Sequence, residues 1–166
     1  MKNLIKLSLA LICLCSVHSM NAQEKGEINV SAGFSGMHID NSLGLALGAE
    51  YIYAKRFSVA AGLLYASAGS TNPVRFESLL SLDFRYYFFN KGVSAYVFSG
   101  YGLHEAQGLD SFNDGNRSLH SAMLGAGAEY EISEKLNVYL QSKGWYNERG
   151  GYQTFNLGVV FRLRKK

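Results

Sequence analysis

The sequence predicts an all-β fold, an eight-stranded antiparallel up-and-down transmembrane β-barrel. Apolar and polar residues alternate with a period of two through most of the chain, as in strands whose two faces meet different surroundings. Eight such segments can be distinguished, and an even number is usual in single-chain membrane barrels. The 11 tyrosines and 10 phenylalanines, set against a single proline, also favour strands.

Residues 1–22 are expected to be a cleaved signal peptide that takes no part in the fold. The start Met1–Lys6 is basic, and the apolar run Leu7–Val17 is too short to span a bilayer as a helix. Cleavage is predicted after Ala22, with cleavage after Ser19 as the alternative.

Residues 23–166 are expected to form a single β-barrel domain with few chemical options. Cys13 and Cys15 leave with the signal peptide, so no disulfide, thiol nucleophile or cysteine metal ligand remains. Lys2 and Lys6 leave too, and the remaining acidic and basic residues nearly balance, so no direct binding of nucleic acid is expected. No later stretch is apolar for the ~18 residues that a helical membrane span needs.

The first three strands follow from plain alternation. Every second residue is apolar in Ile28–Phe34, Leu43–Tyr51 and Phe57–Tyr65, and the residues between them are mostly small or polar. The dipeptide Asp40-Asn41 and the segment Ala54–Arg56 carry the turn residues that join these strands.

The next three strands are joined by one short and one long connection. Apolar residues alternate in Leu80–Phe88 and Ala122–Tyr130, whereas Val93–His104 is rich in aromatic residues on both faces, so its outward face is not assigned. Asn90–Gly92 is a short turn. Glu105–Asn116 is the longest polar stretch and is expected to be a loop outside the membrane.

The last two strands complete the pattern. Ser133–Lys135 turns the chain into the seventh strand, and the eighth is built around Thr154–Leu163. The eight predicted strands are Glu27–His38, Ser42–Tyr53, Phe57–Ser67, Val74–Phe88, Val93–His104, Arg117–Ile132, Leu136–Tyr146 and the final strand around Thr154–Leu163. The turns after the second, fourth and sixth strands are short and some of the others are longer, which is typical of periplasmic turns and outer loops.

Alternation alone does not say which face points outward. A soluble secreted barrel or sandwich would turn its apolar face to a core, and it would fit the pattern equally well. Here the other face gathers glycines and charged residues, which would give a soluble protein an unusually glycine-rich surface. We therefore expect the apolar face, including Leu45, Leu82, Leu124 and Leu157, to meet lipid.

Charged residues on the other face are expected to form a network inside the lumen. The predicted members are Glu50, Asp83, Arg85, Glu129 and Arg162. An isolated ion in so narrow a space is costly, so the two arginines are expected to neutralise the three acids. The favoured interpretation is a structural plug that closes the barrel, and a gated or proton-conducting path is the alternative.

No catalytic, cofactor or metal site is predicted. His120 and Ser121 are neighbours and so point to opposite faces of a strand. No carboxylate is placed to orient His120 toward Ser118 as a catalytic triad requires. His38 and His104 are expected to be isolated polar residues near the outer rim.

Glycines and aromatic residues have structural rather than catalytic interpretations. Gly100–Gly102 and Gly125–Gly127 lie inside strands without the following helix that a phosphate-binding loop needs. They are expected to make room for bulky lumen side chains such as Tyr96 and Trp145. Aromatic residues expected at the headgroup level are Tyr51, Tyr53, Tyr86, Phe88, Tyr130, Tyr139 and Tyr146.

The end of the last strand resembles the C-terminal insertion signal of membrane β-barrels. Asn156, Gly158, Phe161 and Leu163 stand at the spacings of the polar residue, the glycine and the two late hydrophobic residues of that signal. The resemblance implies recognition by the barrel-assembly machinery.

The eight strands together resemble the compact eight-stranded outer-membrane β-barrel superfamily, and the second half is most similar to the TraO family of conjugative-transposon transfer proteins. The stretches that carry this similarity are Val97–Gly102, Gly125–Tyr130, Leu136–Gly144 and Gly158–Leu163. The resemblance implies a non-enzymatic structural part of a conjugative DNA-transfer apparatus in the cell outer membrane, in contact with outer-membrane lipid and other conjugation proteins. A stand-alone barrel for adhesion or envelope stability and a lipid-modifying outer-membrane enzyme are the alternative functions.

Overall fold

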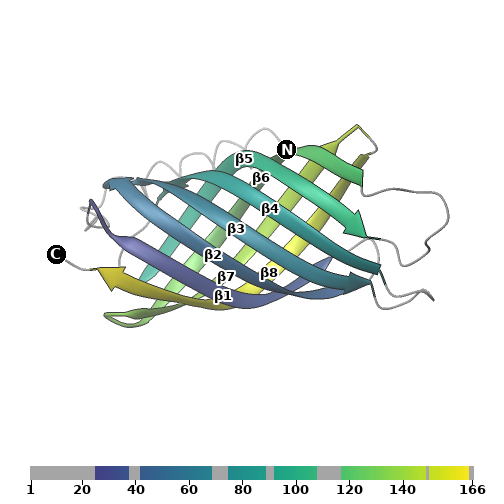
Figure 1. The fold of residues 1–166 in the computed structure, drawn as a ribbon. Helices are drawn as coiled ribbons and strands as arrows, with labels where there is room; N and C mark the ends of the chain where they lie inside the picture. Colours follow the sequence, from purple (N-terminus) through teal and green to yellow (C-terminus); the bar gives the residue numbers. More distant parts are fainter. Residues whose placement is uncertain are drawn as a thin grey trace, which may run out of the picture.

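The chain folds into a closed antiparallel barrel whose strands are tilted to its long axis (Figure 1). The computed structural model describes residues 25–37, 42–68, 75–88, 92–107, 117–148 and 150–164. The strands in these residues are β1 (Ile28–Met37), β2 (Ser42–Ala54), β3 (Phe57–Ala68), β4 (Arg75–Tyr87), β5 (Val93–Gln107), β6 (Arg117–Ser133), β7 (Leu136–Asn147) and β8 (Gly150–Arg164). Each strand pairs with its neighbour in sequence, and β8 returns to β1. The predicted fold class is confirmed.

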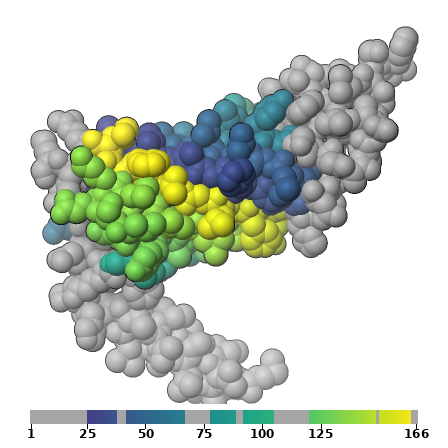
Figure 2. Space-filling model, turned by 90° about the horizontal axis from the view of Figure 1, so that it is seen from below, coloured from purple at the N-terminus to yellow at the C-terminus, as the bar shows by residue number. Residues whose placement is uncertain are grey.

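The two ends of the barrel differ in their connections. At one end, on the left in Figure 1, β1 begins and β8 ends, and Ile28 pairs with Arg164. The tight β2–β3 and β6–β7 turns also lie at this end, where Ala54 pairs with Phe57 and Ser133 with Leu136. We call it the short-turn end, and the opposite end the loop end. Figure 2 views the side of the barrel on which β8 lies between β7 and β1.

Strand ends differ from the predicted ones because backbone pairing continues beyond the alternating segments. β5 runs to Gln107, so Glu105–Gln107 belong to a strand rather than to the predicted loop. Glu105 pairs with Ser118 on β6, and Phe76 on β4 pairs with Gln107. Backbone pairing of β5 with β4 and β6 therefore continues at the loop end. It extends beyond the segment in which side chains must alternate so that apolar residues face lipid.

Other predicted ends shift by smaller amounts. β4 is Arg75–Tyr87 rather than Val74–Phe88, and β8 begins at Gly150, four positions before the stretch on which it was predicted. The remainder of the predicted outer loop, 108–116, and His38 lie outside the described residues, as does the predicted signal peptide. Among the described residues, no helix has the length and apolarity to cross a bilayer.

The apolar face points out of the barrel. Leu45, Leu82, Leu124 and Leu157 are 59%, 44%, 60% and 55% exposed. The residues that alternate with them are small or buried in the lumen, such as Asp83, which is 1% exposed. An outer surface of leucine, phenylalanine and tyrosine around a charged interior is the reverse of a soluble barrel. The predicted orientation is therefore confirmed.

Side chains fill the lumen in distinct groups, as expected for a barrel of this strand number. Toward the loop end the group is apolar and consists of Met37, Leu64, Ala66, Leu79, Met123 and Trp145. Toward the short-turn end it is aromatic and consists of Tyr87, Tyr96 and Phe98. Charged and amide side chains occupy the region around and between these two groups, so the position of the charges is set by the packing on either side.

Two glycines make the close approach of these large rings possible. A Cβ added to Gly127 would lie 2.4 Å from the ring of Tyr96, and one added to Gly102 would lie 2.2 Å from the ring of Trp145. The predicted role of these glycines is confirmed. The prediction for Tyr139 is wrong: its side chain is only 6% exposed and lies in the lumen against Gly158, because it shares the inward face of β7 with Gln141.

Candidate functional site: a charged cluster in the lumen

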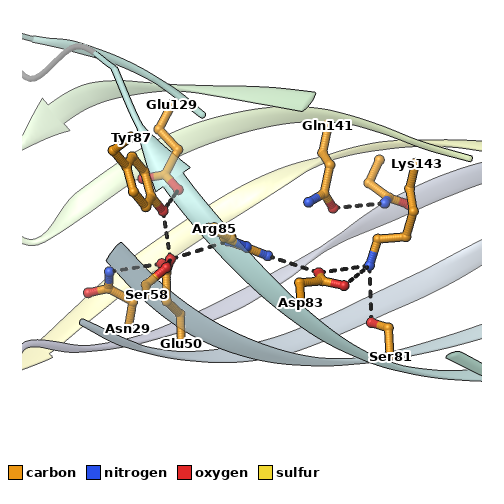
Figure 3. Close-up of polar contacts among 11 residues, drawn as sticks. Asn29, Glu50, Ser58, Ser81, Asp83, Arg85, Tyr87, Glu129, Gln141 and Lys143 are labelled. Atoms are coloured by element: carbon orange, nitrogen blue, oxygen red, sulfur yellow. Dashed lines mark hydrogen bonds and ion pairs between the residues drawn. The ribbon is translucent and has the colours of Figure 1, made fainter. Parts of the chain in front are cut away.

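The most unusual feature of the described chain is a group of buried charges that spans the lumen (Figure 3). Glu50 comes from β2, Asp83 and Arg85 from β4, Glu129 from β6 and Lys143 from β7. Period-two alternation points all five inward. Together with Tyr87, which bridges two of the acids, we call these residues the lumen cluster.

An alternating row of ion pairs runs through the lumen cluster. Arg85 lies between two acids, with Nη1 3.6 Å from Glu50 Oε1 and Nη2 3.6 Å from Asp83 Oδ2. Lys143 Nζ lies 2.9 Å from Asp83 Oδ2 and donates a further hydrogen bond to Ser81 Oγ at 3.0 Å. Each cation therefore has an acid beside it, which is the condition under which buried charges are tolerated.

Of the three acids in the lumen cluster, Glu50 has the most polar partners. Its carboxylate accepts a hydrogen bond of 2.6 Å from Tyr87, one of 3.3 Å from Asn29, and one from the hydroxyl of Ser58. With Arg85 on the same carboxylate, the two strands that flank β2, which are β1 and β3, and the next strand β4 are all tied to one side chain. Such a hub fixes the strands against one another in a low-dielectric interior.

Glu129 is held differently, without a cation. Its carboxylate accepts a hydrogen bond of 3.0 Å from Asn137, and it shares the single hydroxyl hydrogen of Tyr87, whose oxygen is 3.4 Å away, with the nearer Glu50. Among the described residues, no lysine or arginine nitrogen lies within 4.0 Å of it. The expected neutralisation of Glu129 by an arginine is therefore wrong. Hydroxyl and amide donors take that place, because Arg85 is already held by Glu50 and Asp83.

Both cations of the lumen cluster also lie over aromatic rings. The Arg85 guanidinium carbon is 5.0 Å from the centre of the Tyr96 ring. Lys143 Nζ is 5.3 Å from the Phe98 ring and 5.5 Å from the Trp145 ring. Cation–π contacts are stronger where the cation is desolvated, so the apolar and aromatic groups stabilise the charges as well as enclosing them.

Arg162 does not belong to the lumen cluster, although the sequence placed it there. Its Nε lies 3.3 Å from Glu27 Oε1, and Nη2 lies 3.4 Å from Glu131 Oε2. Nη1 donates a hydrogen bond to the backbone oxygen of Glu134 at 3.5 Å. Arg162 thus links β8 to the residue before β1 and to the β6–β7 turn, at the short-turn end. Its ion-pair partners are Glu27 and Glu131 rather than the acids of the lumen cluster.

Sequence reasoning missed several members of this site. Lys143 and Asn137 stand on the inward face of an alternating strand and could have been found by continuing the period-two count along β7. Tyr87 lies on the inward face of β4 two residues after Arg85, as the alternation predicts, but it carries no charge and so was not included in the predicted network. Glu27 is the first residue of the predicted strand Glu27–His38 and has the parity of the inward Asn29, so the same count could have found it, although β1 begins one residue later in the structure.

The four residues of the predicted insertion signal lie on the two faces of β8. Asn156 is 7% exposed and donates a hydrogen bond of 3.2 Å to Gln141 Oε1 in the lumen. Gly158 lies opposite Gly33 of β1. Phe161 and Leu163 point outward. Recognition of these residues by an assembly machinery stays a prediction.

The described histidines do not form a catalytic or metal-binding arrangement. His120 is exposed on the outer wall, where its Nδ1 faces the hydroxyl of Tyr101. His104 Nδ1 lies 3.4 Å from the hydroxyl of Tyr152. Within the residues that the structure describes, no three histidine, cysteine or acidic side chains are grouped as metal ligands would be.

Comparison with known proteins agrees with this architecture. The model of the family described as "Outer membrane protein beta-barrel domain" matches residues 7–162. No curated protein matches the chain. Among solved structures, the N-terminal β-barrel domain of Pseudomonas aeruginosa OprF is similar with a TM-score of 0.66 and 23% identity, covering 85% of this chain and 100% of that one.

Two further structures show how widely this fold is used. Ail, the attachment invasion locus protein of Yersinia pestis, has a TM-score of 0.66 and 19% identity in its complex with a heparin analogue, over 84% of this chain and 100% of that chain. The outer membrane enzyme PagL has a TM-score of 0.55 and 16% identity, over 80% of this chain and 98% of that chain. At these identities the likeness concerns the fold alone.

Proposed function

The chain belongs to the outer membrane protein beta-barrel domain family, and we propose that within this family it is a closed, non-enzymatic barrel with a structural role. It is a small integral outer-membrane β-barrel protein. In the proposed role, the lumen cluster and the packed groups around it hold the barrel rigid, and the loop end makes the contacts on which function depends.

The observation that carries this proposal is the ion-paired row across the lumen. Lys143 of β7 lies 2.9 Å from Asp83 of β4, and Asp83 lies 3.6 Å from Arg85 of the same strand. Side chains leave a cavity of only about 50 Å³ among them. Passage of an ion would require these pairs to separate in a poorly solvated space, which costs several kcal/mol per ion. This supports a plug rather than a path for solutes.

The test is ion flux through the purified protein in lipid vesicles. We expect vesicles containing the barrel to leak ions at the rate of protein-free vesicles, and gramicidin added at the end to give the full flux. Insertion is verified on the same sample by the shift in gel mobility between boiled and unboiled protein. Stepwise conductance of the wild-type protein in planar bilayers would refute the closed barrel.

The absence of enzymatic activity is part of the proposal and needs its own measurement, because PagL shares the fold. The barrel is expressed in a host outer membrane, and the lipids are compared by mass spectrometry with those of cells carrying His120→Ala. We expect identical lipid profiles. A lipid whose acyl chains change only with the wild-type protein would favour the lipid-modifying alternative.

Two roles for the loop end remain candidates. Conjugative DNA transfer rests on the resemblance of stretches such as Gly125–Tyr130 and Leu136–Gly144 to the TraO family. Adhesion or envelope stability draws support from the fold shared with an attachment protein. Deletion of the gene separates them. A loss of transfer frequency with unchanged cell attachment and detergent resistance supports conjugation, and the opposite result supports the stand-alone barrel.

A further inference from the structure

The cavity beside the lumen cluster is lined by several polar atoms that have no hydrogen-bond partner among the described residues. It has a volume of about 50 Å³ and is lined by Asn29, Gln141, Asn156 and Arg85 among others. Asn29 is 2% exposed, Gln141 4% and Asn156 7%, so bulk water does not reach them freely. The cavity is therefore a polar chamber inside the barrel.

Four of these atoms make no hydrogen bond with any described residue. They are two acceptors, Asn29 Oδ1 and Asn156 Oδ1, and two donors, Gln141 Nε2 and Arg85 Nε. The other ends of the three amides are fixed: Asn29 donates to Glu50, and Asn156 donates to Gln141. If the Asn156–Gln141 pair were turned round, one acceptor and one donor would still be left over.

A buried polar atom without a partner costs about 1–3 kcal/mol. Four such atoms around one cavity would cost more than most single side chains contribute to stability, so the native chain must satisfy them in another way. Donors and acceptors are present in equal number, and the cavity is bounded on one side by apolar residues including Leu64, Leu79 and Trp145. These features suit a small neutral ligand that can both donate and accept.

We propose that this cavity is a water-binding site, in which ordered water bridges Asn29, Gln141, Asn156 and Arg85. A buried water needs roughly 10–15 Å³ of accessible volume and two to four polar partners, and the cavity meets both conditions for more than one molecule. The water joins the amides of β7, β8 and β1 to the lumen cluster and solvates Arg85. The inference rests on the proposed closed barrel and adds its internal solvent.

The test uses nuclear magnetic resonance of ¹⁵N-labelled protein in lipid nanodiscs. We expect nuclear Overhauser cross-peaks from the water resonance to the side-chain NH₂ of Gln141 and to the Nε–H of Arg85, with the sign of bound water rather than of proton exchange. In Asn156→Leu/Gln141→Met, where apolar side chains of similar size replace both amides, the Arg85 cross-peak should be lost.

The matched control removes a similar hydrogen bond from the same two strands on the outer wall. Gln153 Nε2 donates to Ser142 Oγ at 2.7 Å, and both residues lie on the outside of β8 and β7. Gln153→Met/Ser142→Ala should keep the Arg85 cross-peak at wild-type intensity. The inference is overturned if the wild-type protein shows no cross-peaks, or if the Arg85 cross-peak survives unchanged in the lumen variant.

Two further measurements separate this inference from its premise. The wild-type spectrum alone decides the outcome if the lumen variant does not fold. Ion flux on the same sample reports on the closed barrel independently, because a conducting barrel would refute the plug while leaving the water cross-peaks in place. A non-conducting barrel without cross-peaks would refute the water site alone.

Discussion

Replacing Asp83 and Lys143, singly and together, should show that the lumen cluster acts as a unit. The two side chains meet at 2.9 Å and are 2% and 7% exposed. Removing one partner of a buried pair costs about 3–5 kcal/mol. Lys143→Met leaves Asp83 with Arg85 at 3.6 Å, so we place it near the lower value. Asp83→Asn leaves Lys143 without an acid and with its hydrogen bond to Ser81 Oγ, so we place it near the upper value.

The double variant is the informative one. Simple addition gives a loss of about 8 kcal/mol, whereas we expect about 5–6 kcal/mol, because removing both charges leaves no ion without its partner. The coupling of about 2–3 kcal/mol is at the upper end of what neighbouring residues show.

The assay is urea unfolding in lipid vesicles, followed by the fluorescence of Trp145, the one tryptophan of the chain. Trp145 packs beside Lys143 in the lumen, so its signal reports on the relevant region. As control, Asp83→Asn is combined with Arg162→Gln, which shares no ion-pair partner with it. That combination should be additive within about 0.5 kcal/mol. Strict additivity for the Asp83–Lys143 pair would mean that each charge is separately solvated, and the plug would then be the wrong reading.

The remaining predictions concern the outer wall, the glycine contacts and the short-turn end. Leu82→Arg should cost ~2–4 kcal/mol in insertion or refolding, while Leu43→Arg, near the loop end of β2, should cost ~0–1 kcal/mol, because the penalty depends on depth in the bilayer; equal costs would contradict the assigned orientation. Gly127→Ala places a Cβ 2.4 Å from Tyr96 and should cost about 1–3 kcal/mol in urea unfolding. Adding Tyr96→Leu should recover part of that loss, and no recovery would speak against the contact. Arg162→Gln should cost about 1.5–3 kcal/mol, since it breaks charged hydrogen bonds at the barrel closure; hydrogen exchange should rise first in β1 and β8, and a uniform rise would argue against this local role.

Much of the barrel could be predicted from the sequence because each strand has two chemically different faces. Alternation identified the outward position of Leu45 and the inward position of Glu50 without reference to any partner strand. Strand ends were less certain, since the ladder at Glu105 continues where side chains no longer need to alternate. The face of Tyr139 was misjudged because an aromatic residue near a strand end fits either side.

Pairing across the lumen was the part that alternation could not supply. Inward direction is a local property, whereas the partner of an inward side chain depends on the tilt and stagger of strands around the barrel. Arg162 and Arg85 both point inward, yet the stagger carries Arg162 to the short-turn end and leaves Arg85 beside Glu50. Lys143, which completes the row, lies 60 residues from Asp83 in the sequence.

The fold that this chain shares with other barrels does not determine its role. An attachment protein and an outer membrane enzyme share its architecture at 19% and 16% identity, so strand number and closure cannot select a role. In this chain the interior is occupied by the lumen cluster, with apolar and aromatic side chains packed against both of its cations. If the lumen cluster has the structural role that we propose, the two ends of the barrel are the surfaces that can vary with function. Contacts made at the loop end are therefore where its biological partner should be sought.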